Sequence, residues 1–332
     1  MILTRTPMRV SMFGGGSDHP EHFLHHGGAV LGMAIDKYVY VGVKRMPPGQ
    51  IGINGIPIRY RVQYSHVDDC LRAEGVQHPA IRAALQYLAM IGHDEPMEFH
   101  CFADLPGRSG LGGSSSFVVG LLAALQAHHS LPGNGSLCLA REAVAFEQLE
   151  AGGFQDQIFA AVGGVQYIEF GVDSTVNPIS LTPTRRRELE QSLVLVYSGT
   201  MRDGHAMAAK QLARIETNTR DLRRMSDFAI AARALLIDEH EPLATIGRML
   251  GDAWHVKRDL HPEISTTEID SLYARGLALG ALGGKLCGAG GGGFLLFFVP
   301  QEWRVYFEKY IGAPCVSFKI AQQGSHILVN EP

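Results

Sequence analysis

The chain has 332 residues, of which 46% are hydrophobic and 19% charged, and its formal net charge at pH 7 is −4. This length is enough for two modest domains or one large one with a substantial core. The slight acidic excess argues against a nucleic-acid-binding surface, which is usually basic. No segment approaches the ~18 consecutive apolar residues of a membrane-spanning helix, and the start of the chain lacks the apolar core of a signal peptide. Five scattered cysteines without CxxC spacing favour reduced thiols over disulfides. We therefore expect a cytoplasmic protein without nucleic-acid or membrane partners, and we leave the oligomeric state open, with a homodimer as one alternative.

Strand-like and helix-like patterns alternate along the chain. Residues 29–43 are rich in β-branched and aromatic residues, which predicts strands. Residues 78–92 carry apolar side chains at helical spacing, with Pro79 suited to a first turn. We further predict strands at 97–103, 163–170, 193–197 and 294–299, and helices at 117–125, 137–151, most of 203–257 and 268–281. The composition changes near residues 190–200, so we predict two domains, 1–190 and 191–332, in an α+β arrangement.

Of the 39 glycines, 13 lie in three clusters, at 14–16, 110–113 and 283–293. Glycine loses more conformational entropy on folding than other residues, so three clusters need a reason. In the second, "LPGRSGLGGSSSFVVGLLAALQAH" (105–128), three serines stand between the glycines and a helical apolar pattern. The first N–H groups of a helix are unpaired and carry the positive end of its dipole, which predicts an anion-binding loop here, with phosphate as its commonest ligand. The spacing fits neither a Walker A loop nor a dinucleotide fingerprint. The alternative is a serine cap with a flexible approach.

Pro106 to Ser116, "PGRSGLGGSSS", resembles the second motif of the GHMP kinases, the family of galactokinase, homoserine kinase and mevalonate kinase. Residues 9–18, "RVSMFGGGSD", resemble the first motif of that family, and residues 285–294, "KLCGAGGGGF", resemble its third. The resemblance implies a two-domain α+β fold, with an N-terminal ribosomal-protein-like β-α domain and a C-terminal ferredoxin-like domain. It places the active site in the cleft between them, with ATP and Mg²⁺ as cofactors.

Within the family, "GGGSD", "GGFQDQ" (152–157) and "AWHVKRDLHPEIST" (253–266) are similar to the heptose kinases. That branch implies transfer of the γ-phosphoryl group of ATP to the C1 hydroxyl of D-glycero-D-manno-heptose 7-phosphate, for nucleotide-activated heptose and surface glycan synthesis. The alternatives are a kinase for fucose, galactose or mevalonate, and a sensor that binds sugar and ATP without catalysis.

The resemblance also assigns the nucleotide and metal sites. ATP contacts are expected from the second and third motifs: Pro106, Ser109, Gly110, Leu111, Gly112, Gly113, Ser114, Ser115, Ser116, Gly288, Ala289 and Gly290. A Mg²⁺ ion would be held by Ser115 and by a helix carboxylate, with Glu147 as first choice and Glu150 as second. The alternative is that both glutamates are surface acids of a helix.

Two residues are expected to act directly on the acceptor hydroxyl. Asp156 matches the aspartate that lies beside this hydroxyl in galactokinase-like enzymes, where it would serve as general base. Arg9 matches a basic residue that approaches the hydroxyl and the γ-phosphate, and it would neutralise charge on the transferred group. The alternatives are an aspartate in a turn after two glycines and a surface arginine on a strand.

The sugar is expected to contact the first motif and a few cations. Ionised Asp18 can accept two hydrogen bonds from neighbouring hydroxyls, which suits a sugar. The expected substrate-binding residues are Ser11, Gly15, Gly16, Ser17, Asp18, Arg202 and Lys257. Arg202 and Lys257, with Lys210 and Arg258 as further candidates, would hold the distal phosphate. A solvated helix face is the alternative for the residues at 210, 257 and 258.

Two other polar clusters receive structural interpretations. Arg185-Arg186-Arg187 is followed by two glutamates, which is typical of the solvated start of a helix. The histidines at 19, 22, 25 and 26 resemble a metal cluster, but they follow the first motif where the family has a variable short helix, so we favour a helix without metal.

Overall fold

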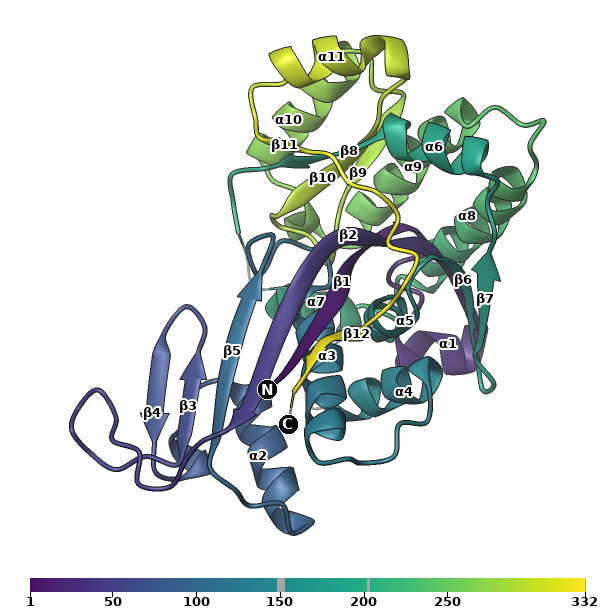
Figure 1. Ribbon diagram of the computed structural model, residues 1–332. Coiled ribbons are helices and arrows are strands. Elements are labelled where there is room, and N and C mark those ends of the chain that lie inside the picture. The colour runs from purple at the N-terminus through teal and green to yellow at the C-terminus, as the bar shows by residue number, and fades with distance from the viewer. Residues whose placement is uncertain (148–152, 202–203, 332) are drawn as a thin grey trace.

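The computed structural model describes residues 1–147, 153–201 and 204–331, and these form two sheets with helices packed on both (Figure 1). The strands of the large mixed sheet are β1 (Ile2–Phe13), β2 (Gly28–Arg45), β3 (Tyr60–Gln63), β4 (Val67–Cys70), β5 (Met97–Ala103), β6 (Val165–Phe170), β7 (Thr175–Ile179) and β12 (His326–Asn330). Their order is β12-β1-β2-β5-β3-β4, and β6 pairs with both β2 and β7. The strands of the small sheet are β8 (Leu193–Tyr197), β9 (Gly283–Leu286), β10 (Phe294–Phe298) and β11 (Cys315–Val316), in the antiparallel order β11-β8-β10-β9.

The helices connect and cover these sheets. They are α1 (Pro20–His26), α2 (Pro79–Met90), α3 (Gly113–His128), α4 (Ser136–Glu147), α5 (Gln155–Val162), α6 (Pro183–Ser192), α7 (Gly204–Leu212), α8 (Thr219–Ile237), α9 (Ala244–Asp259), α10 (Thr267–Ala278) and α11 (Gln301–Tyr310). Short 3₁₀ turns occur at Ala73–Gly75 and Pro262–Ile264. α3 packs on β1 and β2, α8 contacts the same two strands, and α9 packs on the small sheet. The helices thus bring the two sheets together.

The long strand β2 organises the large sheet. Its first part, from Gly28 to Met33, pairs with β6, and its last part, from Val39 to Arg45, pairs with β5. β1 pairs with β2 in the antiparallel direction, from Ile2 to Phe13. At the other end of the chain β12 returns to pair with β1, so the C-terminal residues lie in the N-terminal sheet. The division near residue 190 stays a prediction about domains.

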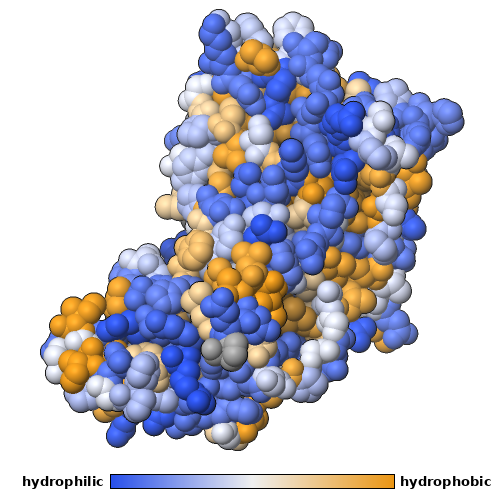
Figure 2. Space-filling model, in the orientation of Figure 1, coloured by the Kyte–Doolittle hydropathy of each residue, from blue (hydrophilic) through white to orange (hydrophobic). Residues whose placement is uncertain are grey.

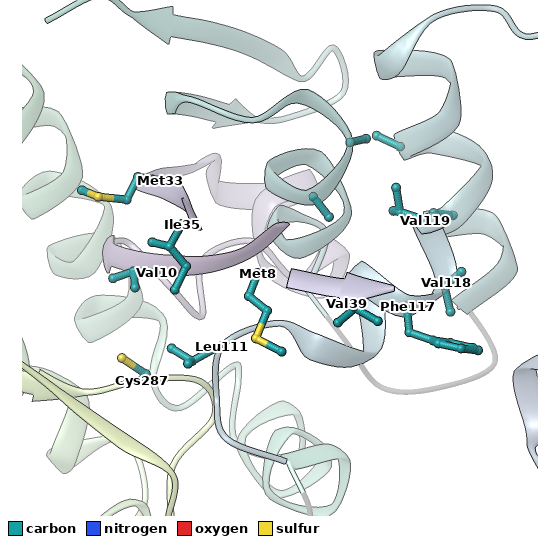
Figure 3. Close-up of a cluster of buried hydrophobic side chains, with 14 of the residues drawn as sticks. Met8, Val10, Met33, Ile35, Val39, Leu111, Phe117, Val118, Val119 and Cys287 are labelled. Atoms are coloured by element: carbon teal, nitrogen blue, oxygen red, sulfur yellow. The ribbon is translucent and has the colours of Figure 1, made fainter. Parts of the chain in front are cut away.

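The core of the large sheet continues into the glycine clusters. Met8 and Val10 of β1 and Met33 of β2 are buried in one cluster (Figure 3). Leu111 and Cys287 belong to the same buried cluster and lie beside these strands (Figure 3). The second and third glycine-rich motifs are therefore both anchored in the core by buried apolar side chains, because burying these groups stabilises the loop positions.

Most elements predicted from periodicity are confirmed. The helix after the serines, the helix beginning at Pro79 and the strands at 97–103, 193–197 and 294–298 are present. The helical region from 203 to 257 forms three helices, α7 to α9. Residues 148–151 of the helix predicted at 137–151, and residue 203, lie outside the described residues.

The interpretation of the basic triplet is correct for the helix but wrong for one arginine. α6 begins at Pro183 with Thr182 as its cap. Arg185, however, is buried, and its guanidinium donates hydrogen bonds to four main-chain carbonyls at the end of α8 and the turn after it, those of Leu235, Leu236, Asp238 and Glu241. A helix C-terminus leaves carbonyls without partners, so a buried cation is stabilised there.

β3 and β4 form an arm that projects from the rest of the molecule (Figure 1). The segment before β3 carries three exposed isoleucines, Ile51, Ile53 and Ile56, and Figure 2 shows hydrophobic residues gathered at the tip of this arm. Within the described part of the chain, none of the helices has the length and apolarity to cross a membrane.

Candidate active site

The three glycine-rich motifs meet at a cavity of about 620 Å³. Its walls come from the end of β1, the segment between β1 and α1, the loop before α3, the start of α5, α7, and the loop between β9 and β10. Sequence segments more than 100 residues apart therefore form one site, as the cleft prediction required.

The serine-glycine loop curves into the first turn of α3. Gly112 precedes this helix in a left-handed conformation, with φ of 71°, and Ser114 and Ser115 follow in the first turn and line the cavity. Gly110 lies against the third motif, since a Cβ there would come within 2.6 Å of the Cys287 carbonyl oxygen. The glycines at 110 and 288 thus let two loops touch backbone to backbone, a reason for glycine that the sequence did not reveal.

Arg9 and Asp156 form a two-point ion pair in the cavity. Nε of Arg9 donates to Oδ1 of Asp156 at 2.7 Å, and Nη2 donates to Oδ2 at 2.6 Å. The third donor, Nη1, reaches the carbonyl oxygen of Gly110 at 2.5 Å. The guanidinium is 6% exposed and the carboxylate 21%. Burial alone would lower the pKa of Arg9, but the Asp156 carboxylate more than offsets it, so this pKa lies above its ordinary value. The pair connects β1, the serine-glycine loop and the first turn of α5.

Asp18 is a second buried carboxylate on the cavity wall. It accepts hydrogen bonds from the main-chain N–H of Gly16 at 2.9 Å and from the side-chain amide of Gln155 at 2.9 Å. A Cβ at Gly153 would lie 2.0 Å from Oδ2 of Asp18, so the glycine before α5 leaves room for this carboxylate. The first motif and the "GGFQDQ" segment are therefore one structural unit.

Three buried polar atoms beside these carboxylates have no hydrogen-bond partner among the described residues. They are Oγ of Ser11, Oε1 of Gln155 and Oε1 of Gln157, and all three residues line the cavity. Buried polar groups in folded proteins are almost always paired, by protein, water or ligand. The residues line the cavity while these three oxygens lie just beneath its surface.

Two buried lysines lie on the side of the third motif. Nζ of Lys257 donates to the carbonyl oxygens of Leu286, at 3.2 Å, and Gly288, and Nζ of Lys285 donates to those of Ser11 and Met12 at 2.9 and 3.0 Å. Burial, together with the positive charge of Lys285, lowers the pKa of Lys257 to about 7, and burial lowers the pKa of Lys285 to about 8. A cavity with such lysines favours an anionic ligand, because an anion stabilises their charged forms.

A hydroxyl and a carboxylate that suit Mg²⁺ lie together at the end of α4. Oγ of Ser115 donates to Oε1 of Glu147 at 3.3 Å, and the side-chain amide of Gln157 donates to Oε2 at 2.5 Å. Hard oxygen ligands of this kind are what Mg²⁺ prefers, so the residues present fit the ion. The alternative ligand, Glu150, lies outside the described residues.

Most residues predicted for the site line this cavity. The predicted residues that do so are Arg9, Ser11, Gly15, Gly16, Asp18, Ser109, Gly110, Gly112, Gly113, Ser114, Ser115, Glu147, Asp156, Lys257, Gly288, Ala289 and Gly290.

Four predicted residues do not line the cavity. Leu111 is buried in the core below the loop, and Ser116 donates to the carbonyl oxygens of Pro7 and Gly112. Ser17 bonds to main-chain groups of Gly14 and Ala29, and Pro106 is exposed at the entrance to the loop. These residues shape the loops, and their direct contact with ATP or sugar stays a prediction that their positions do not support.

The candidates for the distal phosphate separate into three groups. Arg202 lies outside the described residues. Lys210 and Arg258 are partly exposed and in ion pairs, with Glu263 at 2.6 Å and Asp270 at 3.4 Å, which agrees with a solvated helix face.

Lys257, by contrast, is buried in the cavity, so the solvated alternative is wrong for this residue. Its role toward a phosphate stays a prediction.

Of the four histidines after the first motif, His19 directly precedes α1 and the other three lie within it. They do not make a metal cluster among the described residues. His22 is buried with neither ring nitrogen paired to a described residue, and burial, with nearby His26 and Arg223, lowers its pKa to about 4. The ring of His26 contacts that of His22, and its Nδ1 lies 3.0 Å from Arg223. These contacts hold α1 against α8.

Sequence reasoning missed several residues of the cavity. Lys285 and Arg108 lie inside the quoted motifs but received no role, although a cation within a phosphate-binding motif was a usable signal. Gln155 and Gln157 flank Asp156 and were read only as support for it. His19 and Gln211 also line the cavity, and nothing in their sequence context marks them.

Comparison with known proteins agrees with this geometry. Residues 78–164 match the family model of the GHMP kinases N terminal domain, and residues 231–304 match that of the GHMP kinases C terminal domain. The chain belongs to the GHMP kinase family. It is accordingly an ATP-dependent kinase, and the predicted two-domain GHMP kinase fold is confirmed.

Three relatives illustrate the range of this GHMP kinase's similarities. It is 28% identical over 307 residues to a D-glycero-alpha-D-manno-heptose 7-phosphate kinase of Campylobacter jejuni, which covers 90% of this chain and 89% of the relative. It is 27% identical over 337 residues to a bifunctional fucokinase/GDP-fucose pyrophosphorylase of Arabidopsis thaliana, covering 92% of this chain but 31% of that longer protein. The crystal structure of a D-glycero-D-manno-heptose 1-phosphate kinase from Bacteroides thetaiotaomicron superposes with a TM-score of 0.78, at 22% identity over 99% of both chains.

Proposed function

We propose that this GHMP kinase transfers the γ-phosphoryl group of ATP to the C1 hydroxyl of D-glycero-D-manno-heptose 7-phosphate. The observation that carries the proposal is the Arg9–Asp156 pair, which lies in the same cavity as the serine-glycine loop. The alignment with a heptose 7-phosphate kinase over most of both chains supports the choice of sugar. The product would supply nucleotide-activated heptose for surface glycans.

The unpaired polar atoms favour a polyol over a simple alcohol. Ser11, Gln155 and Gln157 each present a buried oxygen without a partner among the described residues, and Asp18 lies among them. Side-chain rotations that turn these oxygens into the cavity would let a sugar with several hydroxyls pair with them together, because each hydroxyl both donates and accepts. Mevalonate, with fewer hydroxyls, would leave some of them unpaired, and an unpaired buried group lowers affinity.

Phosphoryl transfer needs alignment, charge stabilisation and a proton acceptor. The triphosphate would lie along residues 109–115, where glycine backbone and serine hydroxyls face the cavity. The C1 hydroxyl would donate its proton to Asp156 as its oxygen forms a bond to the γ-phosphorus. The bond from that phosphorus to the β,γ-bridging oxygen breaks, and ADP leaves. Each oxygen of Asp156 accepts one bond from Arg9, and a carboxylate oxygen has a further lone pair for the sugar.

Arg9 would orient the carboxylate and face the transferred group at the same time. Its fixed, planar fork holds Asp156 from one side, and its raised pKa keeps it cationic. Ser115 and Glu147 would hold Mg²⁺, which neutralises charge on the β- and γ-phosphates when bound. The lysines at 257 and 285 would add positive charge below the phosphates.

A panel of acceptors tests the proposal. Purified protein with ATP and Mg²⁺ is assayed for ADP release with heptose 7-phosphate, the unphosphorylated heptose, heptose 1-phosphate, fucose, galactose and mevalonate. We expect the highest kcat/KM for heptose 7-phosphate and a product whose new phosphorus signal couples to the anomeric proton. Preference for another acceptor would contradict the substrate assignment, and binding of ATP and sugar without ADP release would favour the sensor alternative.

A further inference from the structure

A cluster of histidines far from the active site has the geometry of a metal site. His128 is the last residue of α3, His129 follows it directly, and Glu95 lies in the segment between α2 and β5. One ligand atom from each of these three residues lies within 4.8 Å of the others. α3 has 16 residues and rises 1.5 Å per residue, so the cluster is about 24 Å from the serine-glycine loop at the other end of the helix. Its ligand is therefore not the Mg²⁺ of ATP.

The separations are close to those of ligands around one small cation. Oε1 of Glu95 lies 2.8 Å from Nε2 of His128, a hydrogen bond that a bound ion would replace, and 3.7 Å from Nδ1 of His129. Ligands bound to zinc at about 2.0–2.2 Å in a tetrahedron are about 3.3–3.5 Å apart. The two distances lie on either side of that value, so small rotations of the side chains would bring all three atoms to one ion.

The surroundings of the three residues support binding by this set. Arg45 donates a hydrogen bond to Oε2 of Glu95, while Oε1 of the same carboxylate faces the two imidazoles. Hydrogen-bond partners of this kind orient metal ligands. The side chain of His129 is 5% exposed, so its Nδ1, the nitrogen that faces Glu95, lies where bulk water has little access. The ring of His93 packs on that of His129, with centroids 4.5 Å apart. A C-terminal helix end, which carries negative potential, also favours a cation here.

We propose that His128, His129 and Glu95 bind one zinc ion, which ties the end of α3 to the segment between α2 and β5. Two of the three ligands are imidazoles, and this ligand type determines which metal binds. Imidazole ligands suit zinc and nickel, whereas Mg²⁺ requires oxygen ligands. Three protein ligands leave a fourth tetrahedral position for water. The ion would fix the helix whose other end carries the phosphate-binding loop.

Zinc titration of the untagged, EDTA-treated protein tests the proposal. Isothermal titration calorimetry should show about one Zn²⁺ per chain, and Co²⁺ in its place should give the visible absorption of a tetrahedral site. Zinc should raise the melting temperature, and Mg²⁺ should not displace it. His128→Gln and His129→Gln should each weaken zinc binding by about 100-fold or more, since even outer-shell changes weaken it by about 10–100-fold.

Two control variants locate the site. His100→Gln removes a histidine on neighbouring β5, which pairs with Glu98, and the double variant His25→Gln/His26→Gln removes two of the three histidines of α1. The α1 variant leaves the buried His22 in place, and both variants should bind zinc like the wild type. Circular dichroism and kinase turnover without added zinc check that every variant folds. No zinc uptake by the wild type would overturn the proposal, as would uptake that survives both ligand substitutions or that disappears only in the α1 variant.

Discussion

Replacing Asp156 separates its structural role from its chemical role. The carboxylate holds the buried guanidinium of Arg9 through two hydrogen bonds of 2.7 and 2.6 Å. Asp156→Ala leaves that cation with only the Gly110 carbonyl, and breaking a buried ion pair from one side typically lowers stability by about 3–5 kcal/mol. Because the carboxylate is 21% exposed, water can replace part of the loss, and we expect about 3 kcal/mol.

The loss of activity should be larger than the loss of stability alone can cause. A positioned general base contributes about 10²–10⁴-fold to rate, so Asp156→Ala and Asp156→Asn should both lower kcat by at least about 100-fold. Asp156→Asn keeps one oxygen for Arg9, so it should retain more stability than alanine while losing as much turnover. ATP affinity should change little, because the phosphate-binding loop is left in place.

Three measurements decide between the roles. Urea unfolding followed by circular dichroism gives the change in stability, a coupled ADP assay gives kcat, and calorimetry with an ATP analogue gives affinity. The double variant Arg9→Met/Asp156→Ala serves as control: removing both partners should recover stability lost by Asp156→Ala but no turnover. Turnover within tenfold of wild type in Asp156→Asn would refute the assignment of the base.

Three further predictions concern a pH effect, a glycine and a buried arginine. Burial lowers the pKa of Lys257 from 10.5 to about 7, so between pH 7 and 10.5 the unfolded chain binds more protons than the folded one. The free energy of unfolding should therefore rise with pH in this range, by up to about 1.4 kcal/mol per pH unit. Lys257→Met should flatten this rise when unfolding by urea is measured across the range. Gly153→Ala should lower kcat/KM for the sugar by about 100-fold by displacing the first-motif aspartate, whereas Gly133→Ala, whose Cβ would meet nothing within 4 Å, should match wild type. Arg185→Ala should lower the free energy of unfolding by about 3 kcal/mol because it removes a buried donor to four carbonyls. As a control, Arg187→Ala removes an exposed arginine of the same helix and should change the free energy of unfolding by less than about 0.5 kcal/mol. Equal effects of the two substitutions would contradict this account.

The parts of the site that lie within one sequence segment could be predicted. The glycine-serine run followed by an apolar period of 3.6 indicated a loop at a helix start, and α3 begins at Gly113. Asp156 was predicted between its two glutamines, and it lies in the first turn of α5, where the helix dipole favours an acid.

Contacts between distant segments were not predictable from local pattern. Nothing in the sequence near Arg185 shows that carbonyls 50 residues later would surround it, because the end of α8 is brought there by tertiary packing. The same holds for Lys257, whose helical spacing fits a solvated face equally well. The glycines at 110 and 288 were assigned to ligand contact, but part of their role is to let two loops pack together, and only the fold reveals that neighbour.

A crystal structure with Mg²⁺, a nonhydrolysable ATP analogue and heptose 7-phosphate would test the central claim most directly. We predict that the triphosphate lies along residues 109–115 and that the C1 hydroxyl lies within hydrogen-bond distance of Asp156, in line with the γ-phosphorus. A nucleotide bound away from this loop, or a sugar whose C1 hydroxyl points away from Asp156, would contradict the account.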